Sequence, residues 1–137
     1  AADVDQLAAL NHAFNGVERS GEAIGRALQA NDRTETVLVA DVGGTLAGFL
    51  GLQTLRSICY DAPWAEITEL YVAPPLRGQG VGEALVCAAV AHAESAGASE
   101  LLLRTNEANA AAQRLGDRVG LERAPHRVYR RVFGGGR

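Results

Sequence analysis

A glycine-rich turn between a predicted strand and a predicted helix is the clearest candidate for chemistry in this sequence. The turn runs Arg77-Gly-Gln-Gly-Val-Gly82, after Pro74 and Pro75 stop the strand and before a long helix with one apolar face. Glycines let backbone N–H groups approach an anion, and a helix N-terminus supplies positive potential. An arginine adds a charge-assisted hydrogen bond. Together these features predict a phosphate-binding turn.

Two common phosphate-binding turns do not fit this stretch. The nucleotide P-loop requires Gly-Lys-Ser/Thr, and all thirteen cationic side chains of the chain are arginine. The dinucleotide pattern GxGxxG would need glycine at position 83, where Glu83 stands and would repel a pyrophosphate. A third type of phosphate-binding turn fits the residues.

Two motifs together resemble the GNAT superfamily of N-acetyltransferases. Val72-Ala-Pro-Pro-Leu-Arg77-Gly-Gln-Gly-Val-Gly82 is similar to the Arg/Gln-x-x-Gly-x-Gly/Ala turn with which that family binds acetyl-CoA. Asn109-Ala-Ala-Ala112, followed by Leu115 and Val119-Gly-Leu121, resembles its Asn-x-x-Ala helix and the turn after it. The two motifs also have the family's order and separation. The resemblance covers roughly residues 65 to 133, while the front of the chain matches only in the order of its elements.

The resemblance implies an α/β fold of the GNAT type: a mixed, mostly antiparallel sheet with a splayed central strand pair, flanked by helices. Acetyl-CoA is the implied co-substrate, and no metal is expected. The splay leaves backbone groups open to the pantetheine arm, and the amides of the turn hold the pyrophosphate. Asn109 either bonds the pantetheine arm or caps its own helix. The expected cofactor-binding residues are Leu70, Tyr71, Val72, Arg77, Gly78, Gln79, Gly80, Val81, Gly82 and Asn109.

The implied reaction is attack of a neutral amine on the acetyl thioester, and it needs a proton acceptor. A lysine-like amine has a pKa of ~10.4, so only about one molecule in a thousand is neutral at pH 7. Glu66 and Glu69 on the predicted strand Trp64 to Val72 are the candidate bases, although either could instead be a solvated acid at a sheet edge. Strict alternation puts them on opposite faces, so only one would line the acceptor cleft. Glu66 is slightly favoured, because its position resembles that of the base in histone-acetylating members.

The proton donor for the departing thiolate is open. The family usually has a tyrosine after the leucine at position 115, whereas this chain has Gly116. Tyr129 on the last predicted strand, or a bound water, is the substitute we consider. The same departure keeps an alternative function open, an acyl-CoA-binding sensor or regulatory module with weak catalysis.

The distribution of charge along the sequence suggests what the protein binds. The first 70 residues hold ten acids and four arginines, a net −6, and the rest hold six acids and nine arginines, a net +3. An acidic front half suits a cationic amine of a small molecule or an exposed protein amine, and a mildly acidic total argues against nucleic acid. No apolar run approaches the ~18 residues of a membrane span. Cys59 and Cys87 have no CxxC partner, which fits a reducing cytoplasm. A homodimer is compatible with the resemblance.

The elements that position these residues follow from periodicity and turn signals. One domain is expected over residues 1–133, with a mobile tail over 134–137. Because the chain opens on a helix cap, with Asp3 and Gln6 as a capping pair, a preceding strand is expected to be missing. The other expected elements are helices over 21–30, 81–97 and 108–118, and strands over 36–40, 46–55, 64–72, 100–104 and 127–133.

Overall fold

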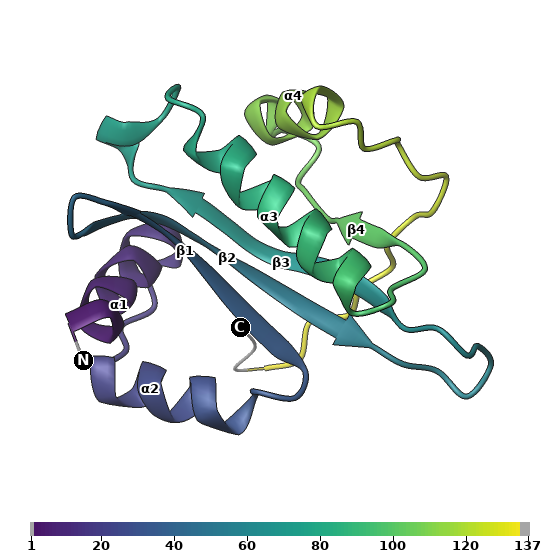
Figure 1. Cartoon of the computed structure of the whole chain (residues 1–137), viewed down its shortest axis with the longest axis horizontal. Helices are drawn as coiled ribbons and strands as arrows, with labels where there is room; N and C mark the ends of the chain where they lie inside the picture. Colours follow the sequence, from purple (N-terminus) through teal and green to yellow (C-terminus); the bar gives the residue numbers. More distant parts are fainter. Residues whose placement is uncertain (1, 135–137) are drawn as a thin grey trace.

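A four-stranded sheet lies between two layers of helices (Figure 1). The computed structural model describes residues 2–134. The strands lie in the order β1 (Glu35–Val42), β2 (Thr45–Leu55), β3 (Trp64–Val72), β4 (Leu101–Leu103). Helices α1 (Ala2–Asn15) and α2 (Gly21–Ala30) cover one face, and α3 (Val81–Ser95) and α4 (Ala110–Arg118) lie on the other side. A single 3-10 turn, η1 (Pro74–Leu76), joins β3 to the loop before α3. β1, β2 and β3 are antiparallel and β4 is parallel to β3, which is the mixed sheet that the sequence predicts.

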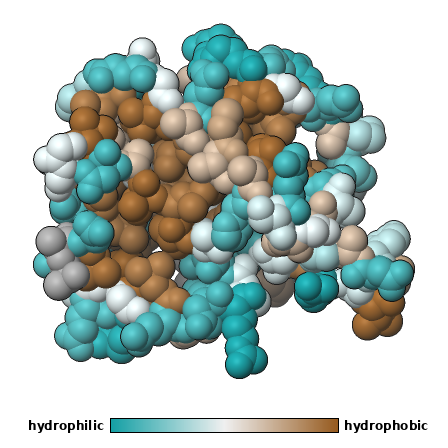
Figure 2. All heavy atoms as spheres, in the orientation of Figure 1, coloured by the Kyte–Doolittle hydropathy of each residue, from teal (hydrophilic) through white to brown (hydrophobic). Residues whose placement is uncertain are grey.

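Each face of the sheet has its own apolar core. On one face Leu50, Leu52 and Ile67 pack against Leu85 and Val86 of α3. On the other face Leu46 and Phe49 pack against Leu7 of α1 and Ile24 of α2, as part of a second cluster. β2 is buried on both faces because it is a central strand, so its apolar run is nearly continuous. Figure 2 shows apolar residues gathered between the two helical layers, with polar residues around them.

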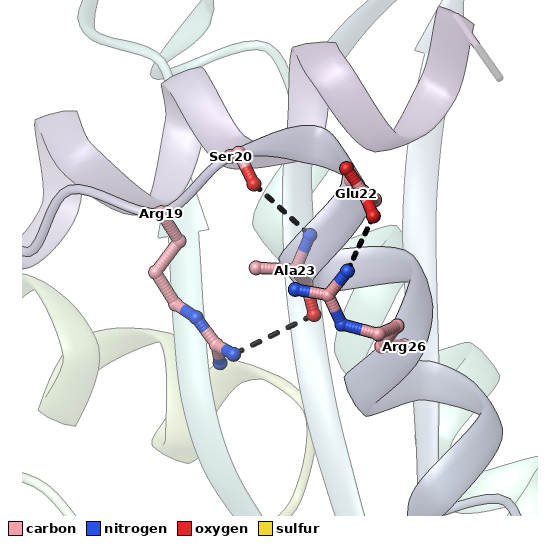
Figure 3. A network of polar contacts seen from close by, with 5 residues as sticks. All are labelled: Arg19, Ser20, Glu22, Ala23 and Arg26. Atoms are coloured by element: carbon pink, nitrogen blue, oxygen red, sulfur yellow. Dashed lines mark hydrogen bonds and ion pairs between the residues drawn. The ribbon is translucent and has the colours of Figure 1, made fainter.

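The start of α2 is fixed by local polar contacts (Figure 3). The Ser20 hydroxyl accepts a hydrogen bond from the amide of Ala23 at 3.1 Å and so caps the helix. Glu22 and Arg26, one turn apart, form an ion pair at 2.5 Å on the solvent side. Arg19 donates to the carbonyl oxygen of Ala23 at 3.5 Å. These contacts set where the helix begins above the sheet.

The predicted capping pair at the front of α1 is wrong. The helix already includes Ala2, so Asp3 lies inside its first turn. Gln6 reaches instead across to the β1–β2 turn, where its side chain accepts from the amide of Leu46 at 2.8 Å and donates to the carbonyl oxygen of Gly44 at 3.2 Å. A local sequence pattern therefore serves a long-range contact that ties α1 to the hairpin.

The predicted last strand over 127–133 is also wrong. The described chain from residue 121 to 133 contains no strand, and the side chains of Val128, Tyr129, Val132 and Phe133 are exposed. Alternation alone does not make a strand, because the backbone also needs a neighbour with which to pair. Cys87 of α3 is exposed. The predicted mobile tail lies, apart from Gly134, outside the described residues.

Candidate active site

The two strands β3 and β4 separate after a short contact. They pair only at Ala65 with Leu101, Glu66 with Leu102 and Ile67 with Leu103. Beyond that point β4 has ended, while β3 continues to Val72. The splayed strand pair expected from the sequence is therefore present, and the β3 backbone from Leu70 to Val72 borders an open space.

That space is a cavity of about 880 Å³, here called the cofactor cavity. The structure brings nearly all of the predicted cofactor-binding residues to its lining: Leu70, Tyr71, Val72, Arg77, Gly78, Gly80, Val81, Gly82 and Asn109. The exception is Gln79, which is not among the lining residues and whose side-chain amide donates to the carbonyl oxygen of Pro75 at 3.4 Å. Residues as far apart in the chain as Leu70 and Asn109 thus meet around one cavity.

The glycine-rich turn presents backbone rather than side chains to the cavity. Gly78 and Gly80 have φ angles of +77° and +83°, in the left-handed region that favours glycine. Gly80 is the N-cap of α3 and makes no side-chain cap, so the first amides of the helix lack a side-chain acceptor there. A Cβ on Gly82 would lie 3.3 Å from Leu115, so this glycine lets α3 and α4 approach closely. The result is a helix N-terminus suited to an anion.

Arg77 is held beside the turn by two contacts. Its Nε donates to the carbonyl oxygen of Val72 at 2.8 Å, and its guanidinium carbon lies 5.4 Å from the centre of the Tyr71 ring. Glu83, the acid that opens α3, also lines the cavity, and it pairs with Arg118 at 3.8 Å. The charges around the cavity therefore include two arginines and one acid that is paired with one of them.

Asn109 caps α4, as one of the two expected roles requires. Its side-chain oxygen accepts a hydrogen bond from the amide of Ala112 at 3.1 Å. The residue also lines the cofactor cavity. Capping therefore fixes where α4 begins relative to the cavity.

A β-bulge in β3 changes the expected arrangement of the two glutamates. Gly51 of β2 pairs with Glu69 and Leu52 pairs with Ile67, so Thr68 is an extra residue on β3. Ile67 on one side of the bulge and Leu70 on the other both pack in the α3 core. Glu66 and Glu69 therefore both point toward the α1–α2 face, and the prediction that they lie on opposite faces is wrong.

The two glutamates have different surroundings. Glu66 accepts from Arg104 at 3.0 Å, and its side chain is 21% exposed. Glu69 accepts a hydrogen bond from the hydroxyl of Thr68, and a Cβ on Gly51 would lie 2.5 Å from its Oε2. Glu69 also lines a second cavity of about 210 Å³ between the sheet and the helices α1 and α2.

The two positions considered for a proton donor lie elsewhere. Tyr129 is 92% exposed and is not among the residues that line either cavity. Gly116 is buried in α4 and lines a third cavity of about 180 Å³, next to the three leucines of β4. The structure therefore does not bring Tyr129 to Glu66, Glu69 or the glycine-rich turn.

One contributor from the front of the chain was not predicted. Phe14, near the end of α1, lines the cofactor cavity and packs on Tyr71, with ring centres 5.4 Å apart. It also meets Phe49 edge-to-face at 6.0 Å. The periodicity of the sequence marks Phe14 as an apolar residue of the helix, but no sequence signal places it at the cavity.

The sequence profile of the acetyltransferase (GNAT) family matches residues 5–121. The chain belongs to this family. The match includes both motifs and also the front half, where the motifs gave no signal. Among curated proteins, mycothiol acetyltransferase of Thermobispora bispora is 37% identical over 86 residues, which are 62% of this chain. The matched stretch spans only 29% of the length of that relative.

Solved structures of acetyltransferases share the fold. Ribosomal-protein-alanine N-acetyltransferase from Brucella melitensis biovar Abortus 2308 matches with a TM-score of 0.80 and 24% identity, over 96% of this chain and 94% of that one. The aminoglycoside N-acetyltransferase AAC(6')-Iy in complex with CoA also gives 0.80, at 17% identity, over 94% of this chain and 88% of that one. At these identities the likeness establishes the GNAT fold, and it leaves the acceptor of this protein undetermined.

Residues 2–134 contain no group of three or more histidine, cysteine or acidic side chains that could hold a metal ion. No helix in this part of the chain has both the length and the apolar character to cross a bilayer.

Proposed function

We propose that this GNAT protein transfers the acetyl group of acetyl-CoA to a primary amine of a small cationic molecule or an exposed protein amine. The observation that carries the proposal is the juxtaposition of two features along β3. One is a large cavity headed by the N-terminus of α3, and the other is a carboxylate, that of Glu69, at the edge of a smaller cavity that β3 also lines. Acetyl-CoA would supply the activated thioester.

The residues of the cofactor cavity fit the parts of coenzyme A. In our proposal the amides of residues 79–82 and the guanidinium of Arg77 hold the pyrophosphate, since they combine helix potential with a charged donor. The open edge of β3 from Leu70 to Val72 bonds the amides of the pantetheine arm as an added strand would. In this arrangement the pantetheine arm extends along β3 toward the region where β3 and β4 are paired. Glu66 and Glu69 lie in or next to that region.

We propose Glu69 as the general base. Arg104 already occupies a carboxylate oxygen of Glu66, whereas Glu69 borders the cavity that an acceptor can enter. Glu69 would take the proton of the attacking amine, directly or through one water. Glu66 would hold Arg104 in place and so stabilise the region where β3 and β4 are paired.

A backbone N–H on the open edge of β3 is our candidate for stabilising the tetrahedral oxyanion, an electrostatic role that needs no side chain. A thiol with a pKa near ~8.5 is a tolerable leaving group, so a water suffices as proton donor in place of a tyrosine.

The test measures release of free thiol from acetyl-CoA with a panel of amines. We expect Glu69→Gln to lower kcat/KM by a factor on the order of 10²–10⁴, because the amide cannot accept the proton. Glu66→Gln should have a smaller effect, and Glu22→Gln, on the solvent side of α2, serves as the charge-matched control. Calorimetry should show unchanged CoA binding in all three variants.

Two results would overturn parts of the proposal. If the wild type binds CoA but releases no thiol above hydrolysis with any amine, the protein is an acyl-CoA-binding module without turnover. If Glu66→Gln loses more activity than Glu69→Gln, the base is Glu66.

A further inference from the structure

The 210 Å³ cavity, here called the acceptor cavity, has an apolar wall and an acidic lining. Its wall includes Leu7 of α1, Ile24 of α2 and Phe49 of β2. Two carboxylates, Glu35 and Glu69, line it from different strands, and Arg19 lines it from the α1–α2 connection. Phe49 packs edge-to-face on Phe14 of the cofactor cavity, so an aromatic pair lies between the two cavities.

The strand register fixes the distance between the Cα atoms of Glu35 and Glu69. Val37, Gly51 and Glu69 stand opposite one another across β1, β2 and β3. Glu35 lies two residues before Val37 on the same strand and therefore on the same face. Two strand spacings and two residues along a strand place the Cα atoms of Glu35 and Glu69 about 12 Å apart. Both residues line one cavity, and this spacing is at the scale of a short aliphatic chain.

The hydrogen bonds of Glu35 and Arg19 leave the net charge of the cavity lining negative. Glu35 accepts from the side chain of Asn31 at 3.4 Å, which is a long and neutral contact. The guanidinium of Arg19 reaches back to the carbonyl oxygen of Ala23 in the first turn of α2 (Figure 3). The two carboxylates and one guanidinium of the lining leave a net charge of −1, which favours a cationic occupant.

The spacing of the two carboxylates suggests the length of that occupant. A linear diamine with about four or five methylenes has about six or seven heavy atoms, and its two amines can face two carboxylates whose Cα atoms lie about 12 Å apart. The cavity, of about 210 Å³, is also much smaller than the cofactor cavity of about 880 Å³.

We propose that the acceptor cavity selects a short linear diamine, with Glu35 as the anchor for the amine that does not react. This inference rests on the proposed acetyl transfer. The charged amine binds Glu35, the methylenes contact the apolar wall, and the second amine lies beside Glu69. Its nitrogen forms a bond to the acetyl carbon, the carbon–sulfur bond breaks, and the electron pair leaves with the thiolate. The proton lost by the nitrogen passes through Glu69 to solvent or to the thiolate.

The experiment compares 1,5-diaminopentane with n-pentylamine, which has the same chain and lacks the second amine. We expect the wild type to favour the diamine at least tenfold in kcat/KM. In Glu35→Gln the ratio of the two kcat/KM values should fall by about tenfold, whereas in Glu22→Gln it should keep the wild-type value. A second variant, Ala27→Leu, adds bulk to the cavity wall from α2 and should raise KM for the diamine without changing any charge.

The outcomes separate this inference from the proposed function. No thiol release with any amine would overturn the proposed function itself. Equal use of the two amines, an unchanged ratio in a folded Glu35→Gln protein, or a higher kcat/KM for an aminoglycoside than for the diamine would overturn the diamine assignment and leave acetyl transfer standing. If Glu35→Gln does not fold, Ala27→Leu decides, because an unchanged KM there contradicts the cavity as the diamine site.

Discussion

The cofactor cavity and the acceptor cavity are both lined in part by β3, and they are built in different ways. The cofactor cavity takes more than half of its lining from the stretch Leu70 to Glu83, and the end proposed to bind an anion is backbone. The acceptor cavity takes isolated side chains from α1, α2 and the three antiparallel strands, and its chemistry comes from carboxylates. One site therefore depends on a local conformation, and the other depends on how distant elements are aligned.

This difference explains how a family can keep one cofactor while its members use different acceptors. A turn of glycines holds a phosphate wherever it precedes a helix, because the donors are main-chain amides. A cavity lined by side chains changes its preference with each substitution in the helices above it. The predictions below test this division.

The largest effect is expected at the anion-binding end of the cofactor cavity. Gly80→Asp places a carboxylate at the N-cap of α3, where the pyrophosphate is proposed to bind. We expect the affinity for CoA, measured by calorimetry, to fall by at least about 100-fold, or about 2.7 kcal/mol. Folding should survive, since Asp is favourable at a helix N-terminus.

Gly80→Asn is the matched control for charge. Asn has the size of Asp and tolerates the left-handed φ of +83° to the same degree, so both variants carry the same backbone strain. The neutral variant should lose much less affinity. Equal losses in the two variants would show that bulk or strain is responsible and would remove the argument for an anion at this turn.

A smaller effect is expected where the bulge holds Glu69. A Cβ at position 51 would lie 2.5 Å from Oε2 of Glu69 and 2.9 Å from Oγ1 of Thr68, so Gly51→Ala must displace both side chains. We expect kcat/KM for the amine to fall by about tenfold, since a shift on the order of 1 Å misaligns the base. CoA affinity should not change.

Gly25→Ala adds the same methyl group in α2, at a site where a Cβ meets nothing within 4 Å. It should keep full turnover. Full turnover in Gly51→Ala as well would show that the position of the Glu69 carboxylate over Gly51 has no part in the reaction.

The same division decides what the sequence can predict. The glycine-rich turn and the Asn109 helix were predicted because residue type and short spacing determine them, and the splayed sheet was expected from the resemblance to the GNAT family. The bulge at Thr68 was not, because alternation assumes a regular register and the extra residue is defined only by the partner strand. The contact of Gln6 with the β1–β2 turn escaped prediction for the same reason, since its partner lies 40 residues away.

The smallest effect is expected in α4, which lines the cofactor cavity and not the acceptor cavity. Gly116 lies within this helix, and an added Cβ would meet nothing within 4 Å. Gly116→Ala should raise the free energy of unfolding by about 0.5–1 kcal/mol, because alanine loses less backbone entropy in a helix. Thermal unfolding should show a rise in Tm of a few degrees.

Gly25→Ala in α2 should give a gain of similar size, for it is also a helical glycine with open space at its Cβ. The two variants therefore change one helix of each cavity: Gly116→Ala lies in α4, which lines the cofactor cavity, and Gly25→Ala lies in α2, which lines the acceptor cavity. Gly116→Ala stiffens a helix that lines the cofactor cavity and not the acceptor cavity, so its effect on binding should be confined to CoA and leave the ratio of diamine to monoamine turnover unchanged. A changed ratio would show that α4 and the acceptor cavity are coupled through β3, and the two sites would then have to be treated as one.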